Sequence, residues 1–218
     1  DNTTVNNNVA ENGQGGGAFN RGTINATNGS QINNNSATSH GGGISADQGI
    51  SVTNLTDTQV NGNTASNHGG GIRNVGTLTA LRTELNDNRI LGTNGQNRVG
   101  AGLWNQGTSA NATFTDSTID GNHAVGRGGA IFNSSGDVTL IRTTVAENAS
   151  SIQGGGYYQE GGNSNLVATN STFSGNKTTT DGTGAALAGT HDGGAIYNNG
   201  GAIELTHVTI ADNTATGN

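Results

Sequence analysis

An apolar residue, two variable positions and an asparagine recur as a motif along the whole chain. The motif asparagines alternate without exception with a triplet of small residues that begins with glycine. Steps between successive motif asparagines are 27, 28, 25, 34, 26, 28 and 37 residues. The asparagines are Asn8, Asn35, Asn63, Asn88, Asn122, Asn148, Asn176 and Asn213, and the triplets begin at Gly15, Gly41, Gly69, Gly100, Gly128, Gly154 and Gly193. A period of about 27 residues is typical of a stacked solenoid, whose units bury their apolar faces against one another.

The repeat changes how the composition is interpreted. Only 29% of the 218 residues are hydrophobic and 39 are glycine, which in an aperiodic chain would favour disorder. Periodic apolar columns are buried efficiently when they stack, so we predict one continuous domain over residues 1–218. The two longest steps predict insertions at 89–99 and 177–192.

Spacing within each unit indicates strands. The position three residues before the motif asparagine is always apolar where it is compared: Ile32, Val60, Leu85, Ile119, Val145, Phe173 and Ile210. Further apolar positions lie eight and ten residues before the asparagine, and alternate residues of a strand share a face. We therefore predict three short strands per unit and an all-β fold, a right-handed parallel β-helix of about eight coils.

The recurring asparagines have a structural interpretation. Stacked asparagine side chains at a turn can bond to one another and to backbone groups, forming a ladder along the axis. A second such column follows the glycine triplets at Asn20, Asn74, Asn105, Asn133 and Asn198, and Ala46 and Gln159 depart from it. We expect both columns to be structural.

Several classes of function are excluded by what the chain lacks. It has no cysteine, hence no disulfide and no thiolate, and its net charge of −7 argues against a nucleic-acid partner. No apolar run approaches the length of a membrane span, so this segment is not expected to insert directly into a membrane. A cysteine-free chain rich in Asn, Thr and Gly fits a secreted or cell-surface bacterial protein.

Three segments resemble a known family. Gly-Gly-Ala-Ile-Phe-Asn at 128–133, Gly-Gly-Ala-Ile-Tyr-Asn at 193–198 and Phe-Ser-Gly-Asn at 173–176 are similar to the paired repeats of chlamydial polymorphic outer-membrane proteins. In most other units Ile, Val or Leu replaces Phe, and Gly replaces Ala. The resemblance implies a right-handed β-helix passenger displayed on the cell surface, with adhesion as its role.

One column after the glycine triplets is the candidate binding site. Alternation places Phe132 outward if Ile131 and Asn133 face inward. The same column carries Phe19, Arg73, Trp104, Phe132, Tyr158 and Tyr197, with Ser45 as the small member. An exposed aromatic stripe of this kind is typical of a site for a glycan or a protein partner. The alternative is that the rings cover one another or are capped by the insertions.

Other polar residues are given structural roles. Asp57, Arg82, Asp116 and Arg142 alternate in charge at one column, which predicts an exposed ladder of ion pairs across coils. His40 and His68 each precede a triplet and are expected to stack one coil apart. No carboxylate is in line with them before Asp192, so we expect no metal site, no cofactor and no catalytic residues.

Three functions compete on this evidence. The first is a structural or adhesive surface module. The second is a polysaccharide lyase or hydrolase, which would need paired carboxylates and a basic partner in one groove. The third is ice binding, on a face with Asn54/Thr56, Thr113/Thr115, Val167/Thr169 and Glu204/Thr206, interrupted at Leu81 and Ile141. Because neither end shows a capping unit, we also expect a segment of a longer protein, or end-to-end association into a filament.

Overall fold

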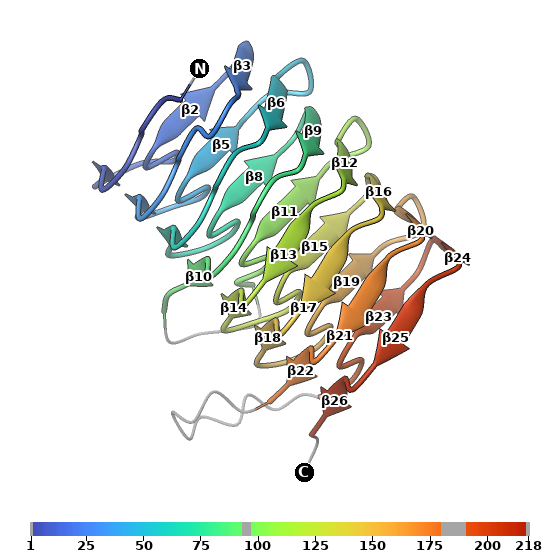
Figure 1. Cartoon of the computed structure of the whole chain (residues 1–218). Helices are drawn as coiled ribbons and strands as arrows, with labels where there is room; N and C mark the ends of the chain where they lie inside the picture. The colour runs from blue at the N-terminus through green and yellow to red at the C-terminus, as the bar shows by residue number, and fades with distance from the viewer. Residues whose placement is uncertain (1, 93–96, 180–190, 217–218) are drawn as a thin grey trace.

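The chain winds into a rod of stacked coils, as the computed structural model shows for residues 2–92, 97–179 and 191–216 (Figure 1). Colour changes steadily from one end of the rod to the other, and the N- and C-termini lie at opposite ends. The described residues form 26 strands and no helix, and every strand pairing is parallel. The predicted all-β parallel solenoid is confirmed.

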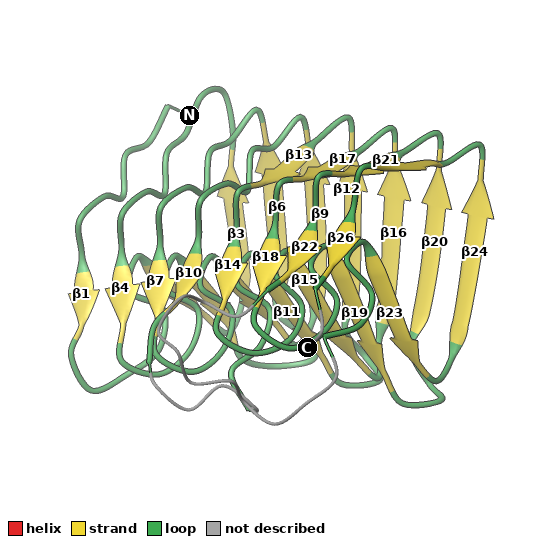
Figure 2. Ribbon diagram, turned by 90° about the horizontal axis from the view of Figure 1, so that it is seen from below, coloured by secondary structure: helices red, strands yellow, loops and turns green. Residues whose placement is uncertain are grey.

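The strands form four sheets that follow one another around each coil (Figure 2). Sheet 1 contains two-residue strands: β1 (Val9–Ala10), β4 (Ser36–Ala37), β7 (Thr64–Ala65), β10 (Arg89–Ile90), β14 (His123–Ala124), β18 (Ala149–Ser150), β22 (Lys177–Thr178) and β26 (Thr214–Ala215). Sheet 2 contains β2 (Ala18–Asn20), β5 (Ile44–Ala46), β8 (Ile72–Asn74), β11 (Leu103–Gln106), β15 (Ile131–Ser134), β19 (Tyr157–Glu160) and β23 (Ile196–Asn199).

The other two sheets complete the coil. Sheet 3 contains β3 (Thr23–Ala26), β6 (Val52–Thr56), β9 (Thr77–Leu81), β12 (Asn111–Thr115), β16 (Asp137–Ile141), β20 (Asn165–Thr169) and β24 (Ala202–Thr206). Sheet 4 contains β13 (Thr118–Asp120), β17 (Thr144–Ala146), β21 (Thr172–Ser174) and β25 (Thr209–Ala211). Single bridges from Thr4 through Gln31, Gln59 and Glu84 to Thr118 continue sheet 4 toward the N-terminus.

Two details of the prediction differ from the structure. The expected eight coils are slightly too many, because sheets 2 and 3 each hold seven strands and the rod makes about six turns. Each coil also has a short strand that the prediction of three strands missed, the sheet 1 strand that directly follows the motif asparagine. The sequence feature that indicates this strand is a small, buried residue two positions after the motif asparagine, such as Ala37, Ala65 or Ala124.

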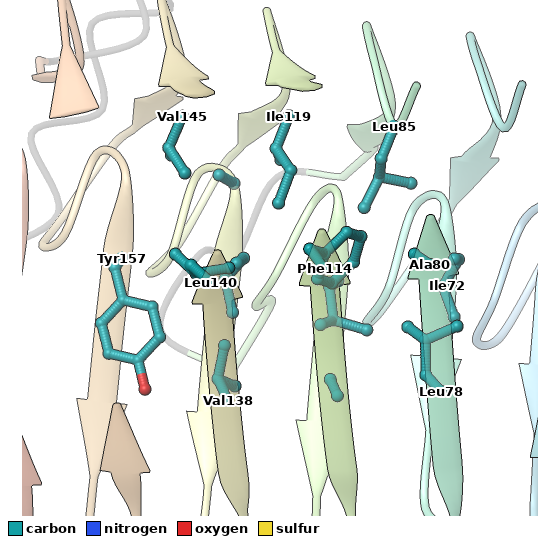
Figure 3. Packing of buried hydrophobic residues seen from close by; sticks show 14 of the residues in the cluster. Ile72, Leu78, Ala80, Leu85, Phe114, Ile119, Val138, Leu140, Val145 and Tyr157 are labelled. Atoms are coloured by element: carbon teal, nitrogen blue, oxygen red, sulfur yellow. The ribbon is translucent and has the colours of Figure 1, made fainter. Parts of the chain in front are cut away.

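The predicted apolar columns form the interior of the rod (Figure 3). Side chains of sheets 2, 3 and 4 converge there, and each lies above its counterpart in the next coil. Ile72, Leu78, Leu85, Phe114 and Phe173 are among the members that are fully buried. A parallel, in-register stack places each apolar residue beside the equivalent apolar residue of the next coil. One or two apolar residues per strand are therefore enough to form a core that is continuous along the axis.

The motif asparagines form the expected ladder. Each Nδ2 donates to the Oδ1 of the next coil's asparagine at 2.9–3.1 Å, from Asn8 through to Asn213. The same Oδ1 also accepts from the backbone N–H of the preceding asparagine, as Asn122 does from Asn88 at 2.9 Å. A second bond from Nδ2 reaches a backbone carbonyl, that of Leu85 at 2.8 Å in the case of Asn122. The buried amides are therefore satisfied along the axis.

The second asparagine column forms side-chain hydrogen bonds from coil to coil between Asn74, Asn105 and Asn133. Asn74 donates to Asn105 at 2.8 Å, and Asn105 donates to Asn133 at 2.9 Å. At the next coil, Gln159 replaces asparagine and the Tyr157 hydroxyl fills the gap. Asn133 donates to that hydroxyl at 3.0 Å, and the hydroxyl donates to Gln159 at 2.8 Å. The buried Tyr157 in the core thus explains how the ladder tolerates glutamine.

The glycine triplets turn the chain at the closest approach between coils. Gly41 has a φ of 61°, in the left-handed region that favours glycine. At the next position, a Cβ on Gly42 would lie only 2.2 Å from the carbonyl oxygen of Thr64 in the following coil. The triplets are therefore structural, as predicted.

The alternating charges are exposed pairs at the corner between sheets 3 and 4. Arg82 contacts both carboxylate oxygens of Asp57, at 2.6 and 2.8 Å, and Arg142 contacts Asp116 at 2.6 and 2.9 Å. The exposed ladder is confirmed as two separate pairs. The hydrogen bond from each arginine lowers the pKa of its aspartate. Exposure limits the contribution of each pair to stability.

The predicted insertions, 89–99 and 177–192, start too early, because their first two residues are the sheet 1 strands β10 and β22, which pair with the neighbouring coils. The added residues lie between β10 and β11 and between β22 and β23. Their central residues, 93–96 and 180–190, lie outside the described residues.

Replacing Asn122 with alanine tests the ladder. The substitution removes the acceptor of Asn88 and the donor to Asn148, both fully buried. We expect the free energy of unfolding, measured by urea denaturation, to fall by about 3 kcal/mol or more, because buried polar groups lose their partners. Asn54→Ala is the matched control, since its bond to Asn25 is exposed, and should cost at most about 0.5 kcal/mol. Equal losses in the two variants would contradict the ladder's role.

Candidate functional site

The outward column of sheet 2 forms a second apolar cluster, separate from the core. Val99, Trp104, Phe132 and Tyr158 pack together outside the coil, with Tyr197 against them, while Ile131 lies in the core. The predicted outward direction is therefore correct. We call these five residues the outer cluster.

The predicted exposure of the stripe is wrong for most of its rings. Trp104 is 8% exposed, Phe132 3% and Tyr158 2%, whereas Phe19 is 45% exposed. The rings cover one another, which was the alternative: Phe132 and Tyr158 stack with centroids 4.9 Å apart, and Tyr158 and Tyr197 stack at 5.1 Å. In-register pairing of β15, β19 and β23 produces this arrangement, because it places the three side chains one above another.

The N-terminal part of the column is polar. Arg73 donates to Gln14 at 2.9 Å and contacts Asp47, and its guanidinium carbon lies 5.3 Å from the centroid of Trp104. Burial raises the pKa of Asp47, but hydrogen bonds from Arg73 and Arg21 hold it below its usual value. Arg73 is therefore committed to neighbours on the same face, and Phe19 lies apart from the outer cluster against Arg21.

The two histidines stack as predicted. The rings of His40 and His68 are 4.8 Å apart and nearly parallel, and both lie against Trp104. Burial, followed by the charge of Arg73, lowers the pKa of His40 to about 4. Burial, followed by the charges of His40, Arg73 and Arg98, lowers the pKa of His68 to about 4. Neutral rings at ordinary pH extend the aromatic surface of Trp104.

A hollow of about 320 Å³ opens over part of the outer cluster. It crosses three side-by-side columns of the outer surface: the residues before the triplets, the aromatic column, and the ends of the sheet 2 strands. It is lined by His68, Asn97, Val99, Trp104, Arg127, Phe132, Ser134 and Glu160. We call it the aromatic hollow.

Two of its charged residues were missed in the sequence. Arg127 occupies the position directly before a triplet, in the column that the bridges connect from His40 and His68 through Val99. Following that histidine column for two more coils would have found it. Glu160 pairs with Ser134 two positions beyond the aromatic column, and its signal was the same outward alternation.

The hollow offers two kinds of contact. Trp104 and Phe132 provide apolar ring surface, while Arg127, Glu160, Ser134 and Asn97 provide polar groups around it. Such a mixture is typical of small-molecule and sugar sites. Of the six residues predicted for partner binding, Trp104 and Phe132 line the hollow, and Tyr158 and Tyr197 support it from the next coils.

A second groove lies at the corner between sheets 3 and 4. It has a volume of about 360 Å³ and contains Asp57, Arg82 and Glu84. Asp57 is bound by Arg82, whose hydrogen bond lowers the pKa of that carboxyl. Glu84 accepts a hydrogen bond from Gln59 at 3.0 Å. The lowered pKa keeps Asp57 ionised, whereas a general acid needs a raised pKa.

In the described part of the chain, no group of three or more histidine or acidic residues is arranged to hold a metal ion. No membrane-crossing helix occurs in residues 2–92, 97–179 and 191–216.

Comparison with known proteins identifies the repeat. The model of the Chlamydia polymorphic membrane protein repeat matches residues 29–47 and 116–134. Both segments cover the same part of a coil, from the sheet 3 corner through the motif asparagine and the triplet to the following sheet 2 strand. The segment 128–133 lies inside the second match, while 173–176 and 193–198 lie outside both. No curated protein and no solved structure matches the chain significantly.

The stacked histidines predict a pH dependence of stability. Their folded pKa of about 4 lies below the usual value near 6.5, so the unfolded chain takes up protons first. Stability is therefore lost as the pH falls from about 6.5 to about 4. We expect the Tm to drop over this range.

A double variant, His40→Phe and His68→Phe, keeps two stacked rings but removes their titration, and should flatten this part of the profile. His207→Asn is the control, because it also removes a histidine but at an exposed position. Asparagine is tolerated there, since Asn170 occupies the equivalent position in the preceding coil. An unchanged pH profile in the double variant would refute the assignment.

Proposed function

We propose that this β-solenoid is an adhesive module of a bacterial cell surface, and that it binds a glycan at the aromatic hollow. The observation that carries the proposal is the combination of Trp104 and Phe132 with a ring of polar side chains in one hollow on the outside of the coil. Sugars present both an apolar ring face and hydroxyl groups, and this lining matches both.

The repeat supports the setting. The chain carries chlamydial polymorphic membrane protein repeats on a parallel solenoid with asparagine ladders, which fits a surface-associated, passenger-like structural protein. The repeat implies a bacterial outer-membrane or surface protein. Secretion and adhesion are the further steps of the proposal. A scaffold without cysteine is suited to an exposed environment.

The size of the hollow favours a glycan over a protein partner. A standard protein interface takes about 800 Å² from each side, whereas the rings of the outer cluster leave little surface uncovered. A volume of about 320 Å³ is at the small end of ligand sites. One or two sugar units therefore suit it better than a flat protein surface.

The two alternatives have less support. A lyase or hydrolase needs a carboxyl group kept protonated beside a second carboxylate in one groove. In the groove at the sheet 3 corner, the hydrogen bond from Arg82 instead lowers the pKa of Asp57. Burial, followed by the charges of Asp87 and Glu147, raises the pKa of Asp120, but this residue does not line that groove. Ice binding needs a regular face. Thr79, Thr113 and Thr139 are in register on the outside of sheet 3, but Val167 and Glu204 continue that column. A measurement of thermal hysteresis tests the ice-binding alternative directly.

End-to-end association into filaments remains a separate prediction. Light scattering of the segment at rising concentration tests it.

A glycan array tests the proposed function. We expect the native chain to bind a restricted set of glycans, and Trp104→Leu to lose about tenfold or more in affinity, because the ring contributes most of the apolar contact. Phe114→Leu is the matched control, since it also removes an aromatic ring but lies in the core. Circular dichroism and the Tm establish that both variants fold. Retained binding in Trp104→Leu, or equal losses in both variants, would contradict the site.

A further inference from the structure

Arg127 stands out among the residues of the aromatic hollow. Its guanidinium carbon lies 5.6 Å from the centroid of the Tyr158 ring. Elsewhere on the rod, Arg21, Arg73, Arg82 and Arg142 each form an ion pair with an aspartate. Within residues 2–92, 97–179 and 191–216, no such pair is formed by Arg127. The ring holds the guanidinium in place without neutralising it.

The guanidinium of Arg127 is also short of hydrogen bonds. Its Nε is buried, and within the described part of the chain it has no hydrogen-bond partner. A charged group that the protein leaves under-satisfied at the wall of a hollow points to an acceptor supplied by a ligand, which would reach the guanidinium through its terminal N–H groups. A guanidinium binds a carboxylate through parallel N–H bonds.

The lining is also polarised. Arg127 belongs to the column before the triplets, and Glu160 belongs to the column at the strand ends, with Trp104 and Phe132 in the column between them. A ligand with one negative group would be attracted to the Arg127 side and repelled from the Glu160 side. Glu160 then suits hydroxyl groups, from which its carboxylate accepts hydrogen bonds. The arrangement therefore fixes the orientation of an acidic ligand.

We infer that the glycan bound at the aromatic hollow carries a carboxylate, as a uronic acid unit does. Arg127 binds the carboxylate, the small exposed parts of Trp104 and Phe132 contact the apolar face of the sugar ring, and Glu160 with Ser134 binds hydroxyl groups on the far side. This inference rests on the proposed glycan-binding function and names the class of sugar. A neutral sugar would leave Arg127 without a partner in a partly buried site, which is costly.

Calorimetric titration with three matched probes tests the inference: a uronic acid oligosaccharide, its methyl ester, and the neutral oligosaccharide of the same linkage. We expect the native chain to bind the acid at least about tenfold more tightly than the ester or the neutral sugar, which is about 1.4 kcal/mol. Arg127→Gln should remove this preference, so that the variant binds the acid and the ester about equally. Added salt should weaken binding of the acid only.

Glu160→Gln provides a second variant at a half-exposed position, where folding is not at risk. Glutamine keeps a carbonyl oxygen that accepts from hydroxyl groups but removes the like charge, so the affinity for the acid should rise about threefold relative to the affinity for the ester. The ester comparison and Glu160→Gln keep the test valid if Arg127→Gln does not fold. Equal binding of acid, ester and neutral sugar would overturn the carboxylate inference while supporting the glycan site. Binding of none of the three, together with a blank glycan array, would overturn both.

Discussion

Backbone hydrogen bonding from coil to coil is the constraint on which the rest of the structure depends. In all four sheets each residue pairs with its counterpart in the next coil, so every side chain lies about 4.8 Å from a side chain in an equivalent place. Stacked amides can then bond to one another, rings can stack, and short apolar residues can form a continuous core. A change at one column is felt first by the same column in the adjacent coils.

The same constraint explains why neighbouring coils are not identical. At the corner before each motif asparagine, the backbone adopts a positive φ in every coil. Asn7 and Asn34 occupy this position in the first two coils, and from Asn34 onward a side chain occurs only in alternate coils. Asp87 lies over Gly121, where a Cβ would come within 2.7 Å of its Oδ1, and Glu147 lies over Gly175 in the same way. The charged corner alternates as well, with Asp57 below Arg82 and Asp116 below Arg142. In the first column glycine alternates with a larger residue, because two large side chains in adjacent coils would clash. In the second column acidic and basic residues alternate, because like charges in adjacent coils would repel. The column Asn34, Gly62, Asp87, Gly121, Glu147, Gly175 and Asp212 therefore has a period of two coils.

Periodicity made most of the fold predictable. The apolar columns, both asparagine ladders, the paired charges and the stacked histidines follow from aligning the units, because in-register stacking converts sequence position into spatial neighbourhood. Exposure was less predictable. Alternation correctly placed Phe132 and Tyr158 outside the coil. Their rings are nevertheless buried because each stacks on a ring of the next coil, and the closeness of that stacking cannot be read from the sequence. Arg127 was missed because its column changes residue type from coil to coil, from His68 to Val99 to Arg127.

Disulfide trapping tests the in-register stacking most directly, since the native chain contains no cysteine. Thr113 and Thr139 are register partners on the outside of sheet 3, at a Cα separation of about 4.8 Å that suits a disulfide. The offset pair Thr113 and Asp137 is about 8 Å apart, which is too far. Under mild oxidation, with cysteines introduced at each pair, mass spectrometry should find an intramolecular disulfide in the first variant and free thiols in the second. Cross-linking of the offset pair, with none at Thr113 and Thr139, would contradict the register and with it the ladders and the aromatic hollow.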